Sequence, residues 1–276
     1  MSETTPDLQR LVHAALRGGI AALEALPGAK RTIDKPLGDF ATEADLASER
    51  VITEMLRESY PHIPIVGEES WQSADLPETF FAVDPFDGTI IASRGCPEWG
   101  VLVTYIESRT PKQAVLLQPQ MGRIVTAERG AGCFLEIAEE NKEKRRIDPT
   151  GEPDSERLVV ALDVNFSTST AQIERSIFPL AVQQKVLLTR TLGSAINGII
   201  ELMLGRVDAY ICPSGGKVWD FAPGAVVLEE LGGKAYLIDQ NSFSLQPFTC
   251  DAVPMGVVFA RTAKVAEVLA RLFESA

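Results

Sequence analysis

An apolar strand that ends in two acids constrains this chain more than any other stretch. Residues 80–89 read FFAVDPFDGT, where an apolar run leads directly to Asp84 and then to Asp87. Pro85 stops the strand, and Gly88 permits a backbone geometry that residues with side chains resist. Two carboxylates aimed at one point beside apolar surroundings repel each other and lose hydration. The fold must therefore supply compensating charge, and a divalent cation is the simplest source.

A second acidic turn lies upstream of this strand. Glu68 and Glu69 follow the apolar approach IPIVG, and the chain between Glu68 and Asp84 is long enough to turn and return to one sheet edge. Carboxylates together with a main-chain carbonyl in the turn after the strand form an oxygen-only donor set, which suits Mg²⁺ rather than zinc. Taken alone, a G-E-E turn is more often an exposed acidic loop.

Local roles account for the other acids when each is taken alone. Asp87 could cap a helix that begins at Thr89, and Asp220 stands where the helix of FAPGAVVLEELGG begins. Thr42 and Asp45 have the T-x-x-D spacing of a capping box. Only the combination of these acids favours a metal site.

The first half of the chain indicates helices followed by a sheet. Apolar residues recur with helical spacing over residues 7–26 and 43–58. The later segments FFAVD, GVLVTYIE, AVLLQP and RIVTAE are short, β-rich and separated by turn residues, which predicts a largely antiparallel sheet. GRIVTAERGAGCFLE is typical of a hairpin with a glycine-rich bend.

The second half alternates strands and helices after a polar stretch over residues 137–156, and such alternation is typical of an α/β layer. We therefore expect an N-terminal α+β domain over residues 1–145, which carries most of the candidate metal ligands, and a C-terminal α/β domain over residues 146–276. The expected elements of the second half are LVVALDV, residues 168–182, VLLTR, residues 194–204, VDAYIC, residues 220–231, KAYLID, MGVVFA and residues 262–275.

Composition excludes several classes of partner. The chain of 276 residues has a formal net charge of −12, and it lacks a Lys/Arg cluster long enough to bind a nucleic acid polymer. It also lacks an apolar signal segment and a run of 18 apolar residues, so we expect a cytoplasmic protein without a membrane partner. The four cysteines form no C-x-x-C pair, which argues against structural zinc and a disulfide framework.

The motifs together resemble the inositol monophosphatase family of Mg²⁺-dependent, lithium-sensitive phosphatases. They occur in the family's order and with similar spacing over about residues 6–260. The matching stretches are GDFATEAD (38–45), GEES (67–70), VDPFDGT (83–89), TLGSA (191–195) and VWDFAPGAVVLEELGG (218–233). The resemblance implies a layered α-β-α-β-α sandwich of the sugar phosphatase type, with the site between the two halves, and a homodimer.

The resemblance also implies two or three Mg²⁺ ions in each subunit. Glu68, Asp84 and the carbonyl of Phe86 would hold the first ion. Asp84, Asp87 and Asp220 would hold the second, and Glu68 would share a looser third ion.

Catalytic and substrate-binding roles follow from the same resemblance. Thr89, hydrogen-bonded to Asp45, would help Glu68 to orient and deprotonate a metal-activated water, which attacks the phosphate in line without a phosphoenzyme. Metal ions can stabilise both the attacking and the leaving oxygen of such a reaction. The expected substrate contacts are Asp87, Gly88, Thr89, Gly193, Ser194, Asn165 and Lys217.

Two stretches depart from the family pattern and leave the substrate open. Ile90, Ile91 and Ala92 replace the residues that usually follow D-G-T, including a polar residue and an aromatic. The stretch CPSGGKV (212–218) lacks the Glu that contacts sugar hydroxyls in inositol phosphatases. Lys217 could favour a second phosphate or a carboxylate instead, although a solvated surface lysine is an equally good interpretation.

We therefore predict an enzyme, a phosphoric monoester hydrolase that acts on a small inositol or sugar phosphate. A phosphatase of 3′-phosphoadenosine 5′-phosphate is the alternative within the same superfamily, and a fructose-1,6-bisphosphatase is a third option. A different class of function is a non-catalytic relative that binds metal or a partner.

Overall fold

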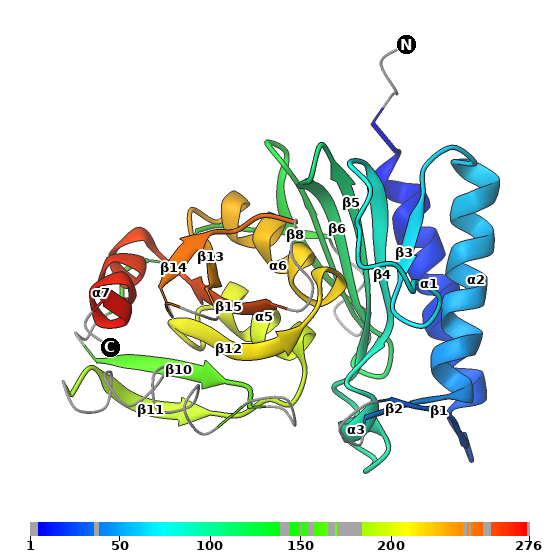
Figure 1. Cartoon of the computed structure of the whole chain (residues 1–276), viewed down its shortest axis with the longest axis horizontal. Helices are drawn as coiled ribbons and strands as arrows, with labels where there is room; N and C mark the ends of the chain where they lie inside the picture. The colour runs from blue at the N-terminus through cyan, green and yellow to red at the C-terminus, as the bar shows by residue number, and fades with distance from the viewer. Residues whose placement is uncertain are drawn as a thin grey trace.

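A computed structural model describes residues 5–35, 39–138, 144–149, 151–153, 157–164, 169, 184–239, 242, 244–250 and 255–274. The elements stack in five layers that alternate helices and sheets (Figure 1). This arrangement confirms the expected α-β-α-β-α sandwich.

Two helices form the first layer. They are α1 (Leu8–Ala25) and α2 (Glu43–Ser59), and both agree with the helical spacing in the sequence. Asp7 caps α1 by accepting the N–H of Gln9. Gly18 and Gly19, which would weaken an isolated helix, allow close packing here. A Cβ atom at Gly18 would lie 2.4 Å from Ile52 of α2.

A seven-stranded sheet forms the second layer, in the order β3-β4-β5-β6-β7-β8-β9. Only the pair β3–β4 is parallel among its pairs, so the expectation of a largely antiparallel sheet with a hairpin at β7–β8 is confirmed. Its strands are β3 (Ile65–Gly67), β4 (Phe80–Asp87), β5 (Gly100–Glu107), β6 (Thr110–Gln118), β7 (Arg123–Glu128), β8 (Gly132–Ile137) and β9 (Arg145–Ile147).

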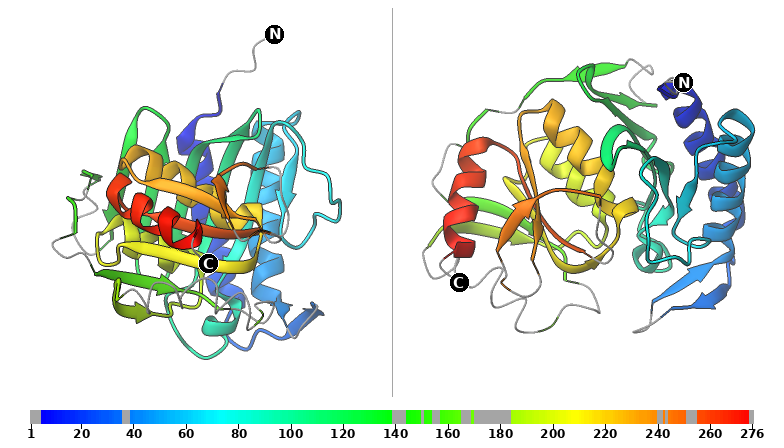
Figure 2. Two further views of the ribbon diagram at one scale, coloured as in Figure 1. Left: turned by 60° about the vertical axis from the view of Figure 1, so that its left-hand side comes forward. Right: turned by 45° about the horizontal axis from the view of Figure 1, so that its top comes forward.

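The third layer consists of α5 (Ala195–Met203) and α6 (Val218–Glu230), which lie between the two sheets (Figures 1 and 2). Helix α6 contacts strands of both sheets, which makes it the centre of the sandwich. A large apolar core surrounds these two helices. Each fully buried large side chain in such a core contributes about 1.5–3 kcal/mol to folding.

A six-stranded mixed sheet and α7 (Ala263–Glu274) complete the stack. In this sheet β10 runs parallel to β11 and β12, and the other pairs are antiparallel. In spatial order the strands are β11 (Val186–Arg190), β10 (Leu158–Leu162), β12 (Ala209–Gly216), β15 (Met255–Ala260), β13 (Lys234–Ile238) and β14 (Leu245–Pro247).

The structure differs from the sequence-based expectations in several places. Pro85 does not stop the strand, because β4 continues to Asp87 with a shift in register after Asp84. Strand β9 forms within the polar stretch over residues 137–156. Strands β1 (Arg31–Asp34) and β2 (Phe40–Thr42) pair within a stretch that carries no strand signal, and β14 was not expected. Helix α6 begins at Val218, two residues earlier than predicted, and its N-cap is Lys217. The helix expected over residues 168–182 lies outside the described residues.

The two sheets come from consecutive parts of the chain, residues 65–147 and 158–260. The expected division between residues 145 and 146 falls inside β9 and stays a prediction. Among the described residues, no helix combines the length and the apolar character needed to cross a membrane.

Candidate active site

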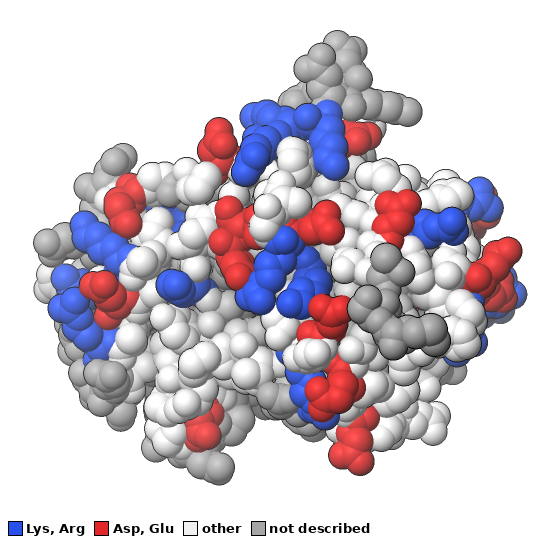
Figure 3. All heavy atoms as spheres, turned by 90° about the horizontal axis from the view of Figure 1, so that it is seen from above, with Lys and Arg blue, Asp and Glu red and all other residues white. Residues whose placement is uncertain are grey.

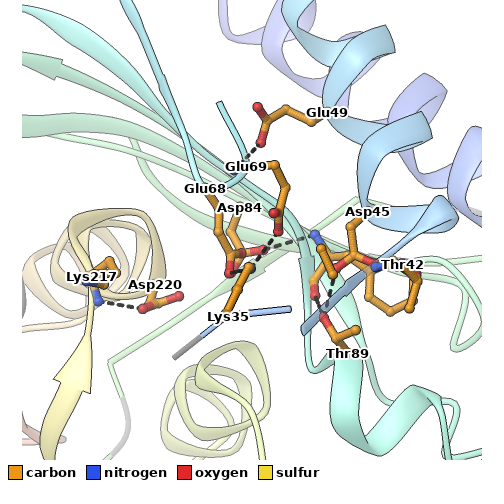
Figure 4. A network of polar contacts seen from close by, with 12 residues as sticks. Lys35, Thr42, Asp45, Glu49, Glu68, Glu69, Asp84, Thr89, Lys217 and Asp220 are labelled. Atoms are coloured by element: carbon orange, nitrogen blue, oxygen red, sulfur yellow. Dashed lines mark hydrogen bonds and ion pairs between the residues drawn. The ribbon is translucent and has the colours of Figure 1, made fainter. Parts of the chain in front are cut away.

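Three elements bring the predicted acids together. Asp84 and Asp87 lie at the end of β4, and Asp220 lies in the first turn of α6. One oxygen from each of these carboxylates can be chosen so that all three lie within 4.8 Å of one another. Glu68 stands beside them because β3 runs parallel to β4, and its N–H donates to the carbonyl of Val83 at 3.1 Å (Figure 4).

A break in strand pairing aims the two aspartates of β4 at one place. Side chains three residues apart on a regular strand point to opposite faces. Here the register between β4 and β5 shifts between Asp84 and Asp87. Asp84 accepts the N–H of Phe86 at 2.9 Å. The ring of Phe86 stacks on Trp99 at 4.1 Å, which fixes the backbone that carries its carbonyl.

Asp87 connects β4 to the second half of the chain. It is 9% exposed, and its carboxylate accepts the N–H groups of Ala195 at 3.3 Å and Ile196 at 2.5 Å. Both N–H groups belong to the first turn of α5, where a helix leaves its donors without internal partners. The helix start therefore stabilises a carboxylate that would otherwise be buried without donors.

Burial and mutual repulsion change the protonation of the cluster. Desolvation, followed by repulsion from Glu68, raises the pKa of Asp84 well above its usual value. Desolvation and repulsion from Asp220 do the same to the pKa of Asp87. Burial and Glu68 raise the pKa of Asp220 from 3.8 to about 7. Burial and repulsion therefore oppose full ionisation of the metal-free cluster, which fits an oxygen-only site for a hard divalent ion.

The hydroxyl of Thr89 lies between the cluster and α2. Thr89 begins the short helix α3 (Thr89–Ala92), and its Oγ1 donates to Oδ1 of Asp45 at 2.9 Å. The other oxygen of Asp45 accepts the N–H and the hydroxyl of Thr42, which completes the capping box predicted from the sequence. The hydrogen bond between Thr89 and Asp45, implied by the resemblance, is present.

Asp220 is not the N-cap residue of α6, contrary to the simplest local interpretation. It occupies the third position of the helix and accepts the N–H of Lys217 at 2.5 Å. The side chain therefore bends back toward the helix start, which is the end of α6 that faces β4.

The sequence did not indicate a lysine that contacts the acidic residues beside the cluster. Lys35 follows β1, and its Nζ atom lies 2.6 Å from Glu68 and 2.7 Å from Glu69 (Figure 4). These two carboxylates outweigh desolvation and raise the pKa of Lys35 above its usual range. An isolated lysine in a polar loop gives no signal of such a contact in the sequence.

Two turns meet on the expected substrate side. Gly88 has φ 99° and Gly193 has φ 77°, a left-handed conformation that favours glycine at both positions. The side chain of Ile91 lies against both, because a Cβ atom would stand 3.1 Å from it at Gly88 and 2.8 Å at Gly193. Ile91, which departs from the family pattern, therefore bridges the two turns with an apolar contact.

The remaining substrate candidates have different surroundings. Ser194 is buried and caps α5 by accepting the N–H of Asn197. Asp163, which the sequence did not indicate, accepts the N–H groups of Leu192 at 2.9 Å and Gly193 at 3.0 Å and so holds this turn. Asn165 lies outside the described residues.

Comparisons with known proteins agree with this arrangement. The sequence pattern of the inositol monophosphatase family matches residues 5–276. The Nus factor SuhB of Xylella fastidiosa is 30% identical over 234 residues, which cover 83% of this chain and 80% of the relative.

Solved structures share the fold. The extragenic suppressor protein suhB from Bartonella henselae superposes with a TM-score of 0.78 at 21% identity and covers 96% of this chain and 97% of its own. An inositol monophosphatase from Anabaena (Nostoc) has a TM-score of 0.74 at 22% identity, covering 97% of this chain and 95% of its own.

Proposed function

Because the chain belongs to the inositol monophosphatase family, we propose that it is a phosphoric monoester hydrolase that requires Mg²⁺ and acts on small phosphate esters. The observation that supports this most directly is the convergence of Asp84, Asp87 and Asp220 from two parts of the chain, with their oxygens within 4.8 Å. Carboxylates clustered in this way are costly without a cation.

The proposed metal ligands divide between two or three ions. Glu68, Asp84 and the Phe86 carbonyl would hold one ion, and Asp84, Asp87 and Asp220 would hold another. Glu68 would also contribute to a third. Bound Mg²⁺ would supply the positive charge that an acidic protein lacks for phosphate oxygens and for activating water.

The proposed proton path uses side chains that already have partners. The hydroxyl of Thr89 donates a hydrogen bond to Asp45, so the lone pairs of Thr89 Oγ1 remain to accept a hydrogen bond from water. Glu68 accepts the proton that the water loses. Asp45 is 2% exposed and accepts from Thr42 as well, which keeps Thr89 in one orientation.

The proposed phosphate contacts are the turn at Gly88 and Thr89 and the turn at Gly193 and Ser194. Asp87 and Lys217 contribute from the cluster side, and Asn165 stays a prediction. Inositol or sugar phosphates are the proposed substrates, with 3′-phosphoadenosine 5′-phosphate as the alternative. Lys217 provides the support for a bisphosphate such as fructose 1,6-bisphosphate.

Phosphate release tests the proposal. The purified protein is assayed with inositol 1-phosphate, 3′-phosphoadenosine 5′-phosphate and fructose 1,6-bisphosphate, in EDTA and in Mg²⁺. We expect release only with Mg²⁺, and a loss of at least about 100-fold in Asp87→Asn because a direct ligand is removed. Asp75→Asn, which changes an exposed acid away from the cluster, is the matched control. Undiminished turnover in Asp87→Asn would contradict the proposal.

The name of one relative favours a second candidate. The protein of Xylella fastidiosa is called a Nus factor, so a role as a Nus factor, with a metal site that need not turn over, is the alternative for this chain. A strain that lacks the gene can be complemented with wild type or with Asp87→Asn. Full rescue by an Asp87→Asn protein that releases no phosphate would assign the phenotype to the second function. The expected homodimer stays a prediction under either function.

A further inference from the structure

Helix α2 directs a second buried acid at the site. Asp45 and Glu49 are four residues apart, so they lie on one face of the helix. Asp45 is 2% exposed and Glu49 is 5% exposed, and both point from α2 toward the cluster (Figure 4). Asp45 holds Thr89, whereas Glu49 has no part in the proposed reaction.

Glu49 contacts the backbone of the turn that carries Glu68. Its Oε2 atom accepts the N–H of Glu69 at 2.8 Å, and its carboxylate also accepts a hydrogen bond from the side chain of Ser70. Gly67 makes this approach possible, because a Cβ atom there would lie only 2.7 Å from the Glu49 carboxyl carbon. The Glu49 carboxylate therefore packs directly against the backbone of Gly67.

The same turn is fixed at two other points. The N–H of Trp71 donates to the carbonyl of Gly67 at 2.9 Å, and the N–H of Glu68 donates to Val83 of β4 at 3.1 Å. The backbone on both sides of Glu68 is thus bonded, on one side to β4 and on the other to Glu49. These bonds fix the backbone at Glu68, and therefore the point from which its side chain extends to Lys35 beside the aspartates.

A buried carboxylate at position 49 destabilises the folded state unless its hydrogen bonds compensate for the lost hydration. Burial and repulsion from Glu68 raise the pKa of Glu49, so its charge is costly. An apolar residue would fill the same space without that cost, but it would leave the N–H of Glu69 and the hydroxyl of Ser70 without an acceptor.

We propose that Glu49 is a positioning residue that holds residues 67–70 in the conformation that directs Glu68 at the metal cluster. Asp45 holds the turn at Thr89 in the same way, so α2 sets the relative position of the two turns that carry metal ligands. This inference rests on the proposed function, because it gives Glu68 the role of a ligand.

Metal binding tests the inference separately from turnover. Chelator-treated protein is titrated with Mn²⁺ in a calorimeter, in roughly 0.5 M KCl so that general charge effects are screened. Residues that orient metal ligands typically contribute about 10–100-fold to affinity. We expect Mn²⁺ binding to weaken by about 10-fold or more in Glu49→Gln, and further in Glu49→Ala, which removes both acceptors.

A third variant separates position from charge. Gly67→Ala keeps every acid but forces the Glu49 carboxylate away from the turn, so we expect the same loss of affinity. Glu54→Gln removes one exposed acid from the same helix and should bind Mn²⁺ as wild type does. Melting curves in EDTA establish that each variant is folded.

Three results would overturn the inference. If folded Glu49→Gln and Gly67→Ala bind Mn²⁺ as tightly as wild type, the positioning role is wrong while the proposed function stands. If Glu54→Gln weakens binding as much as Glu49→Gln does, the effect is one of net charge and the inference is wrong. If wild type binds no Mn²⁺, the proposed function fails and the inference fails with it.

Discussion

At the scale of single residues, Lys35 places a positive charge next to the acidic cluster, where carboxylates repel one another. Its ammonium group lies between Glu68 and Glu69, whose side chains are 24% and 3% exposed. Glu69 turns toward this lysine, whereas Glu68 faces both the lysine and the aspartates. The lysine thus neutralises part of the cluster when no cation is bound.

Lys35→Met should therefore destabilise the metal-free protein more than the metal-loaded protein. The contact is intermediate between a surface pair and a buried pair, so we expect a loss of about 1–3 kcal/mol in EDTA. Melting curves in EDTA and in Mg²⁺ measure the difference. Lys30→Met, at an exposed position, is the control. An equal loss with and without Mg²⁺ would contradict this explanation.

Some residues of the candidate site could be predicted from the sequence, and others could not. Asp84, Asp87 and Asp220 were expected together, and the structure places them together, because their motifs carry strand ends and helix starts. Lys35 and Glu49 were missed. Both contact residues that are distant in the sequence, so no local motif indicates their roles. An acid on a helix or a lysine in a loop usually lies at the surface, which made an exposed position the natural expectation.

At the scale of elements, α6 is fixed at both ends. Asp220 lies in its first turn, beside β4, and its last residues contact the β7–β8 hairpin, several strands away in the seven-stranded sheet. Glu230 accepts the N–H groups of Gly130 and Gly132, each at 2.7 Å. Glu229 pairs with Arg129. Figure 3, which views the molecule from above, shows acidic and basic side chains interspersed on that face.

Glu230→Ala should destabilise the protein by about 1–3 kcal/mol, because two backbone donors lose a charged acceptor. Glu229→Ala removes the neighbouring exposed pair with Arg129 and should cost less than about 1 kcal/mol. Urea unfolding of the two variants, with wild type beside them, gives both values. Equal effects would show that the backbone hydrogen bonds of Glu230 add nothing beyond a surface charge.

Most helices and strands could be predicted because their apolar spacing is regular. The start of α6 was not, because its N-cap Lys217 makes no side-chain hydrogen bond to the helix and offers no recognisable start signal. Strands β1, β2, β9 and β14 were missed for another reason. Each has only three or four residues, too few to show an apolar pattern, so pairing with a neighbour defines them.

At the scale of the whole molecule, the acids make stability depend on pH. Desolvation and Glu68 raise the pKa of Glu69 to about 7, and the pKa of Asp220 is also raised to about 7. Both groups hold protons in the folded state at pH values where the unfolded chain has lost them. The folded state then binds more protons, so these groups lower stability as pH rises from about 4 to about 7.

Mg²⁺ should reverse this trend, because a cation takes the place of the protons. We expect the gain in melting temperature on adding Mg²⁺ to grow as pH rises from about 5 to about 8. Other titrating groups contribute equally in EDTA and in Mg²⁺, so the difference between the two curves isolates the cluster. A gain that stays constant or shrinks with pH would contradict the prediction.

The position of α6 has a consequence for the order of events during synthesis. The ribosome makes Asp84 and Asp87 long before Asp220, and α6 follows the whole of the seven-stranded sheet in the chain. A nascent chain that ends before Val218 carries two of the three clustered aspartates and lacks α6. Assembly of the complete acidic cluster is therefore a late step in biogenesis, and an interrupted translation product would lack it.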